Sequence, residues 1–190
     1  MKGIASVLFT VFAAGAAFAH GPQLFAEEPI VVDEPTLSWV FVGEFVTGDE
    51  VFKLQLAFTE SGFALPFEML VPHQAQLKDH RPSYAVIGPG LPAPTDEERA
   101  LLPREVPAGM GVFLERNRAE PRVTLFEGFL RRMYWTSEPV ALALDQGDCE
   151  VWVWSPRGTV GKFALGFGVE EDFGFDSVLD VLADWSDFAY

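Results

Sequence analysis

The sequence predicts an all-β fold: an antiparallel β-sandwich of the jelly-roll type, followed by a short C-terminal helix. About nine or ten short apolar or alternating segments follow one another along the chain, and turn residues separate them roughly every 8–12 positions. The chain is 14% aromatic, with 18 Phe and five Trp. Aromatic side chains favour the pleated, half-buried surface of a sheet, which supports the same prediction.

The first residues are typical of an export signal. Lys2 provides a positive start, residues 4–18 are apolar without an acidic side chain, and residues 17–19 match an A-x-A cleavage site. The apolar run is short for a membrane span, which needs ~20 residues. We therefore expect a signal peptide over residues 1–19, cleavage near Ala19, and a secreted or periplasmic protein that begins at His20.

The strands are expected after an extended N-terminal arm over residues 20–35, which holds three prolines, four acidic residues and one candidate strand at 30–32. The sandwich domain is expected over residues 36–175. Residues 37–45 and 51–58 are two strands that a turn at 47–50 would join as a hairpin. The proline-rich connection 91–107 includes one helical turn at 96–102. Further strands are expected at 67–71, 83–87, 109–114, 122–126, 140–144, 151–154 and 162–169.

The last segment, residues 176–190, has the pattern of an amphipathic helix. Val178, Val181, Leu182 and Trp185 recur at helical spacing, and Asp176 is a suitable N-cap. We expect a short helix there.

Charge and cysteine content exclude several classes of protein. The net charge of −15 disfavours nucleic acid and anionic lipid as partners, and no segment after the leader is long and apolar enough to span a membrane. The single cysteine, Cys149, allows no internal disulfide. Asp148 and Glu150 flank it and should raise its pKa, so we interpret Cys149 as a small buried or edge residue rather than a nucleophile.

Residues 143–165 carry a gly-bearing turn, alternating Val151 and Val153, an S-P-R-G turn and a G-K-F-A-L strand. This pattern resembles the last hairpin of bacterial pre-peptidase C-terminal domains, although Cys149 and Glu150 replace the usual hydroxyl and aromatic residues. Residues 41–58 and 84–90 are similar to other strands of that family, and the G-P-G-L-P loop at 88–92 is similar to one in related secreted bacterial proteins. The resemblance implies a β-sandwich with a non-catalytic accessory or binding role, and it transfers no catalytic residue.

Two groups of residues are candidate sites. A mature N-terminal His20 offers an amine and an imidazole, and with His73 or His80 from one polar loop it could bind copper; the alternative is that His20 is merely the first residue and the others are solvated. Arg131, Arg132, Tyr134 and Trp135 could form a basic, aromatic spot for an acidic protein or carbohydrate ligand. Core packing is the default interpretation of these aromatic residues, and also of Trp152 and Trp154, which share one face of a strand.

The motifs of common enzymes do not occur: there is no G-x-S-x-G, C-x-x-C, H-E-x-x-H or glycine-rich phosphate loop. We therefore predict a secreted or periplasmic, non-catalytic binding or accessory module. The first alternative is a periplasmic copper-binding protein that uses His20, and the second is a secreted hydrolase with a carboxylate site that the sequence does not reveal.

Overall fold

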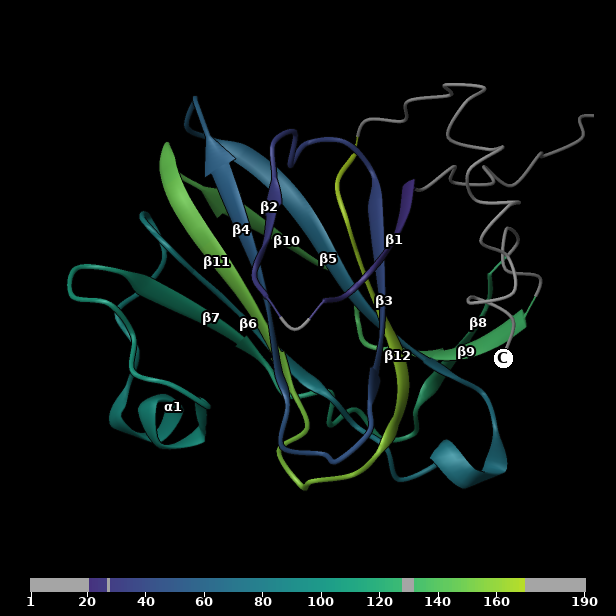
Figure 1. Ribbon diagram of the computed structural model, residues 1–190. Coiled ribbons are helices and arrows are strands. Elements are labelled where there is room, and N and C mark those ends of the chain that lie inside the picture. The colour runs from purple at the N-terminus through teal and green to yellow at the C-terminus, as the bar shows by residue number, and fades with distance from the viewer. Residues whose placement is uncertain (1–20, 27, 128–131, 170–190) are drawn as a thin grey trace, which may run out of the picture.

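Two β-sheets face each other in the computed structural model, which describes residues 21–26, 28–127 and 132–169 (Figure 1). The predicted β-sandwich is confirmed. The predicted leader, His20, Arg131 and the C-terminal helix lie outside the described residues. In the described part of the chain, no helix has the length and apolar character that a membrane crossing requires.

The first sheet has seven strands and the second has five. The first sheet runs in the order β1 (Gly21–Leu24), β3 (Trp39–Phe45), β12 (Gly161–Phe167), β5 (Phe63–Pro72), β9 (Arg132–Thr136) and β8 (Val123–Glu127), and β10 (Val140–Leu144) pairs with the other half of β5. The second sheet runs in the order β2 (Ile30–Val32), β4 (Val51–Phe58), β11 (Gly147–Trp154), β6 (Ser83–Gly88) and β7 (Gly111–Glu115). Two short helical elements, η1 (Ala75–Leu77) and α1 (Asp96–Leu101), lie in connections.

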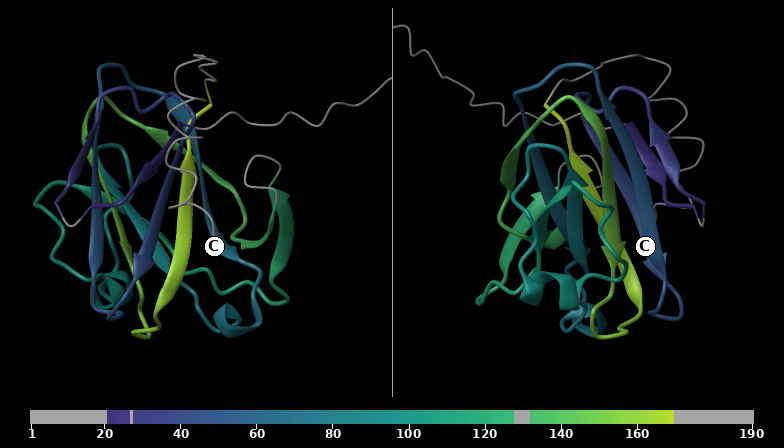
Figure 2. Two further views of the ribbon diagram at one scale, coloured as in Figure 1. Left: turned by 45° about the vertical axis from the view of Figure 1, so that its right-hand side comes forward. Right: turned by 90° about the vertical axis from the view of Figure 1, so that its left-hand side faces the viewer.

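The N-terminal arm divides between the two sheets. Its strand β1 pairs parallel with β3 in the first sheet, and β2 pairs parallel with β4 in the second. The other strand pairs are antiparallel, so both sheets are mixed. Since successive arm strands join opposite sheets, the arm closes one side of the sandwich (Figure 2).

The predicted hairpin of residues 37–58 is wrong, because β3 and β4 belong to different sheets. The same is true of β11 and β12, which the resemblance presented as a hairpin. Alternation along a strand identifies its buried face, but it does not identify the neighbouring strand. The two crossing loops meet at one end of the sandwich, where an added Cβ on Gly48 would lie 2.3 Å from the carbonyl oxygen of Gly158.

The core between the sheets is rich in phenylalanine. Phe45 and Phe163 stack with ring centroids 4.8 Å apart, and Phe41 stacks on Phe167 at 5.7 Å. These side chains are at most 3% exposed. Burial of such large apolar surfaces supplies the main driving force for a fold that has no disulfide.

The outer face of the second sheet is covered as well. Trp152 and Trp154 are 3% and 6% exposed and pack with Val106, in the connection that carries α1. The tryptophan pair is therefore packed, as the default interpretation of the sequence held. The predicted helical turn is present as α1, where Thr95 and Glu98 form a reciprocal capping box. This covering places the end of α1 beside the arginine-rich loops described next.

Candidate functional site

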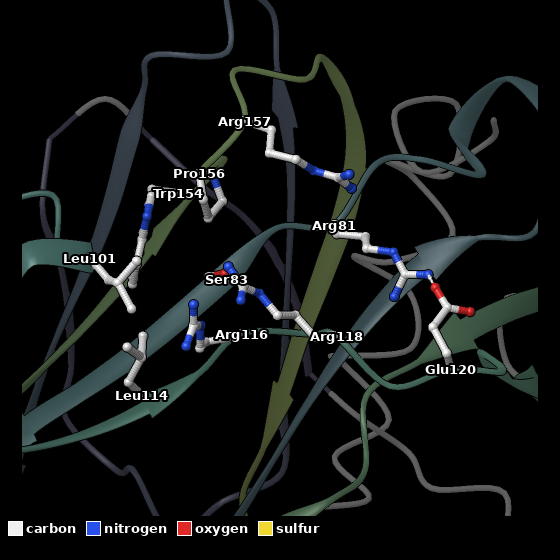
Figure 3. Close-up of a pocket in the computed structure, with 10 residues that line it drawn as sticks. All are labelled: Arg81, Ser83, Leu101, Leu114, Arg116, Arg118, Glu120, Trp154, Pro156 and Arg157. Atoms are coloured by element: carbon white, nitrogen blue, oxygen red, sulfur yellow. Dashed lines mark hydrogen bonds and ion pairs between the residues drawn. The ribbon is translucent and has the colours of Figure 1, made fainter. Parts of the chain in front are cut away.

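A cavity of about 330 Å³ opens between α1, the start of β6, the segment after β7 and the β11–β12 loop (Figure 3). Its volume falls at the lower end of the range for ligand pockets. We call it the arginine pocket. It is lined by four arginines and one glutamate (Arg81, Arg116, Arg118, Arg157, Glu120) together with Ser83, Leu101, Leu114, Trp154 and Pro156.

The charge of this lining is opposite to that of the chain. Four arginines and one glutamate give 4 − 1 = +3, whereas the whole chain carries −15. Four of its thirteen basic residues therefore line one cavity. Because like charges repel, this gathering costs energy unless an anion or acceptor groups compensate it.

Arg81 holds the segment that presents two of the other arginines. Its Nη1 donates hydrogen bonds to the carbonyl oxygens of Asn117 (3.1 Å) and Ala119 (3.2 Å), and its Nη2 forms an ion pair with Glu120. Asn117 adopts a left-handed backbone conformation (φ 46°), and its N–H donates to the carboxylate of Glu115 at 2.6 Å. The segment is therefore fixed from two sides, which preorganises Arg116 and Arg118.

The remaining three arginines of the pocket keep most of their donors available. Arg116 forms an ion pair with Glu97 at 3.2 Å, but Glu97 is 78% exposed, so this surface pair is weak. Arg157 donates to the carbonyl oxygen of Asp79 at 2.6 Å. Arg118 is exposed and has no hydrogen-bond or ion-pair partner in the described part of the chain.

The opposite side of the pocket is apolar. Trp154 ends β11, Leu114 lies on β7 and Leu101 closes α1. Figure 3 shows these side chains on one side of the cavity and Arg81, Arg157 and Glu120 on the other. The pocket thus combines charged donors with an apolar wall, as ligand sites commonly do.

A fifth arginine lies close to the pocket without lining it. Arg122 donates from Nη1 to the carbonyl oxygen of Lys78 at 3.0 Å, and its guanidinium lies 4.3 Å from the centre of the Trp135 ring. Burial lowers the pKa of Arg122 to about 10, and the charges of Arg81 and Arg157 act in the same direction. Arg122 stays charged at neutral pH, in a region that is already positive.

His80 is buried beside these arginines, although we expected it in a solvated loop. It is 2% exposed, its Nδ1 lies 2.9 Å from Thr159 Oγ1, and its ring meets Phe45 edge-on. Burial, together with the positive charges of Arg122 and Arg157, lowers its pKa to about 4. The ring is therefore neutral at pH 7.

The Nδ1 edge of His80 belongs to a small hydrogen-bond network around Thr159. Ser155 Oγ donates to the Thr159 carbonyl oxygen at 2.9 Å and lies 3.0 Å from Thr159 Oγ1. His80 Nδ1 lies 2.9 Å from the same Thr159 hydroxyl, whereas Nε2 is buried without a hydrogen-bond partner in the described part of the chain.

Of the predicted copper ligands, the structure describes His73 and His80, and it places them in different surroundings. His73 is exposed and its ring lies 4.6 Å from that of Trp135, whereas His80 is buried against arginines. No group of three His, Cys, Asp or Glu residues that could hold a metal ion occurs among the described residues, which do not include His20.

The pleat of β9 places Tyr134 and Trp135, two members of the predicted basic and aromatic spot, on opposite faces of the first sheet. Tyr134 is 1% exposed and packs with Val40 and Leu70 on the outer face of the first sheet, whereas Trp135 packs toward the main core. The two rings therefore do not form one exposed platform. Arg132 begins β9, and Arg131 lies outside the described residues.

Cys149 is buried, as the sequence interpretation proposed. It is 1% exposed, and burial together with the charge of Asp148 raises the pKa of its thiol to about 11. The thiol is protonated at neutral pH, which makes it a poor nucleophile.

Sequence reasoning missed the arginine pocket because its arginines come from three separate loops. Arg81 and Arg157 are 76 positions apart. One local signal was present: Arg116, Arg118 and Arg122 fall within seven positions of an acidic chain. Such a cluster indicates a positive patch, although it does not show that distant arginines join it.

No protein-family model matches the chain, and no curated protein matches it. Among solved structures, the chain is similar to the pre-peptidase C-terminal domain of a collagenase from Bacillus anthracis, with 9% sequence identity and a TM-score of 0.39. The alignment covers 75% of this chain and 96% of that domain. It is the type of domain that residues 143–165 resemble. The site residues described above rest on the geometry of this chain alone.

Proposed function

We propose that this chain is an exported, non-catalytic β-sandwich module that binds an anionic ligand in the arginine pocket. The observation that carries the proposal is the gathering of Arg81, Arg116, Arg118 and Arg157 around one cavity of a chain with net charge −15. Arginine forks are suited to carboxylate and phosphate groups, which they bind through paired N–H donors.

The charge distribution favours capture at this one place. An acidic surface repels an anion, whereas a cavity lined by arginines attracts it and concentrates the field between its walls. Salt weakens this steering, because charges are screened beyond ~8 Å at physiological ionic strength. The acidic remainder of the surface therefore discourages non-specific contact with the same ligands.

The apolar wall restricts the ligand further. Leu101, Leu114 and Trp154 offer a surface for an apolar face, so a ligand with one acidic group and one apolar face fits better than a small inorganic anion. An acidic sugar and the acidic end of a peptide both have this chemistry. The predicted protein or carbohydrate partner agrees with either.

The carboxylate arrangement supports binding rather than hydrolysis. Glu120 is the single carboxylate of the pocket lining, and its partner Arg81 keeps it in an ion pair. Glycoside hydrolysis needs two carboxyl groups held across the substrate. The proposal therefore prefers a binding module to the hydrolase alternative.

Export rests on the sequence of the leader. A positive start, an apolar stretch and an A-x-A site support cleavage near Ala19. Mass spectrometry of the protein recovered from outside the cytoplasm tests this: we expect a chain that begins at His20, and an intact Met1 would contradict it.

The copper alternative remains a hypothesis that depends on His20. The positive surroundings of His80 argue against a cation there, because Arg122 and Arg157 act on its ring. A Cu(II) titration of the processed, untagged protein tests the alternative. Equal affinity in wild type and His80→Asn removes His80 from it.

The binding proposal is tested by calorimetry with pairs of ligands that differ by one acidic group, such as galacturonate and galactose, or hexanoate and hexanol. We expect the acidic member of a pair to bind more tightly. Arg118→Gln and Arg157→Gln should weaken binding roughly tenfold each, since each removes a charge-assisted hydrogen bond.

Arg104→Gln is the matched control, because it removes the same charge at an exposed position outside the pocket. It should leave the affinity within about twofold. If Arg104→Gln weakens binding as much as Arg118→Gln, net charge rather than the pocket determines affinity. If no acidic ligand binds better than its neutral counterpart, the proposed function is wrong.

A further inference from the structure

The outer face of the first sheet carries a cluster of buried apolar side chains, which we call the outer patch. Its members come from four neighbouring strands: Val40 and Val42 on β3, Ala164 on β12, Leu70 on β5 and Tyr134 on β9. Each of these side chains is between 1% and 6% exposed. The strand register places Val42, Ala164 and Leu70 in one row across the sheet, so the patch is continuous.

Burial to this degree requires a covering layer. A side chain on the open face of a single sheet keeps one side in water. On the outer face of the second sheet, Trp152 and Trp154 pack with Val106 and Leu102 from the connection that carries α1. The outer patch has no comparable contact, because all of its described members lie on the first sheet itself.

The hydroxyl group of Tyr134 supports the same conclusion. It is closed to solvent and has no hydrogen-bond partner in the described part of the chain. Burial raises the pKa of Tyr134 to about 12. A hydroxyl on a sheet surface that faces water would be hydrated, so this one lies beneath a cover.

The chain leaves the described structure at a place from which it can supply that cover. β12 lies inside the first sheet, between β3 and β5, and ends at Phe167 beside Trp39. Val169 is fixed at the end of the sheet, where its N–H donates to the carbonyl oxygen of Thr36 at 3.0 Å. Residues 170–190 therefore start beside the strands that carry the outer patch.

The sequence of this segment is amphipathic. If residues 176–190 are helical, the apolar side chains fall on one side and the aspartates on the opposite side. The two sets are Val178, Val181, Leu182 and Trp185, and Asp180, Asp184 and Asp187. Such a helix has one face that favours burial and one that favours water.

The dimensions of the patch and of such a helix agree. Along the strands, Val40 lies two residues from the row of Val42, and Tyr134 lies two residues beyond it on the other side. This length is roughly 14 Å at ~3.4 Å per residue, and four strands also extend over roughly 14 Å. A helix over residues 177–188 would be about 18 Å long and about 10–12 Å wide with its side chains.

We propose that residues 176–190 form an amphipathic helix that packs on the outer patch, with Val178, Val181, Leu182 and Trp185 toward the sheet. Residues 170–176 provide the reversal of direction between β12 and the helix. The helix covers the first sheet as the α1 connection covers the second. This inference is independent of the arginine pocket, whose lining comes from β6, β7, β11 and the adjoining loops and α1.

A spin label on Ser186→Cys in the whole processed protein tests the contact. Cys149 is 1% exposed, so the label reacts with the introduced cysteine. We expect the NMR methyl signals of Val42, Leu70 and Ala164 to broaden strongly and that of Val112, on the outer face of the second sheet, to broaden less.

A label on Arg104→Cys is the matched control, because Arg104 is exposed in the connection that covers the second sheet. It should produce the reverse pattern, with the stronger broadening at Val112. A mixture of spin-labelled chain with isotope-labelled, unmodified chain identifies the occupant. The methyl signals of the unmodified chain should stay sharp, and broadening there would show that a second copy supplies the cover.

Leu182→Asp places a charge on the apolar side of the helix, whereas Asp180→Asn changes the acidic side. Leu182→Asp should abolish the broadening from the Ser186→Cys label and lower the melting temperature by roughly 4 °C or more. Asp180→Asn should change neither. The inference is wrong if the Ser186→Cys label leaves the outer patch unaffected, if broadening occurs only between copies, or if the two substitutions behave alike.

Discussion

Replacing His80 with asparagine should remove a pH dependence of stability that arises from one buried ring. The pKa of His80 falls from 6.5 to about 4 on folding, first because the ring is buried and then because Arg122 and Arg157 repel its proton. Between these two values the unfolded chain binds more protons than the native chain, so the free energy of unfolding rises with pH. The contribution is fully present above pH 6.5 and is lost as the pH falls toward 4.

The size of this effect follows from the two pKa values. Each pKa unit corresponds to about 1.4 kcal/mol, so the interval between 6.5 and about 4 corresponds to about 3 kcal/mol. His80→Asn keeps a polar group near Thr159 Oγ1 but cannot take up the proton. Its stability at pH 7 will be lower because the ring no longer packs against Phe45. The informative quantity is therefore the change between pH 7 and pH 4, which should be about 3 kcal/mol smaller in the variant.

Urea unfolding followed by tryptophan fluorescence measures this change, since urea leaves the ionic strength constant. His73→Asn is the matched control, because it removes an exposed histidine and should retain the steep part of the wild-type profile. Parallel profiles of wild type and His80→Asn would refute the reasoning, and they would show that His80 is protonated in the native state without penalty.

Three further substitutions test local features. Glu50→Gln should lower the free energy of unfolding by about 1 kcal/mol at pH 7, after screening by solvent. Burial opposes ionisation of Glu50, but hydrogen bonds from N–H groups of the β3–β4 loop outweigh this effect and lower its pKa to about 2. The stabilisation is therefore present above pH 4.5 and is lost as the pH falls to about 2, where urea unfolding should give the same stability for variant and wild type. Gly48→Ala should cost roughly 1–3 kcal/mol more than Gly62→Ala in thermal unfolding, since both glycines have positive φ (87° and 90°) but only Gly48 faces a carbonyl oxygen 2.3 Å from its added Cβ. Arg81→Met should lower the free energy of unfolding by roughly 2–4 kcal/mol through lost bonds to the Asn117 segment, and a stability equal to wild type would show that this segment holds itself.

Composition and turn spacing were sufficient to predict the sandwich, because both depend on local properties of the chain. The strands at residues 51–58 and 140–144 match β4 and β10 to the residue. Strand partners were not predictable in the same way, since β3 and β4 bury the same kind of side chain from opposite sheets. The turn at Gly48 fits a hairpin or a crossing loop equally well, and the choice depends on contacts with the distant Gly158.

The β9 strand illustrates a second limit. Tyr134 and Trp135 were read as adjacent members of one surface, but neighbouring residues of a strand point to opposite faces. The sequence contained too little alternation around Arg132 to show that a strand was present. A correct strand assignment would have separated the two rings without any structure.

The hydrogen bonds of the half-buried Arg81 explain how an acidic chain can keep a positive cavity. The Arg81 side chain is 15% exposed. Its Nη1 donates hydrogen bonds to the carbonyl oxygens of Asn117 and Ala119, and its Nη2 forms an ion pair with Glu120, so Arg81 stabilises the loop. The loop then carries Arg118 with its donors free. Arg118, in contrast, has no hydrogen-bond or ion-pair partner among the described residues. We propose that Arg81 positions the loop and that Arg118 contacts the ligand, and the Arg81 and Arg118 variants distinguish these two roles.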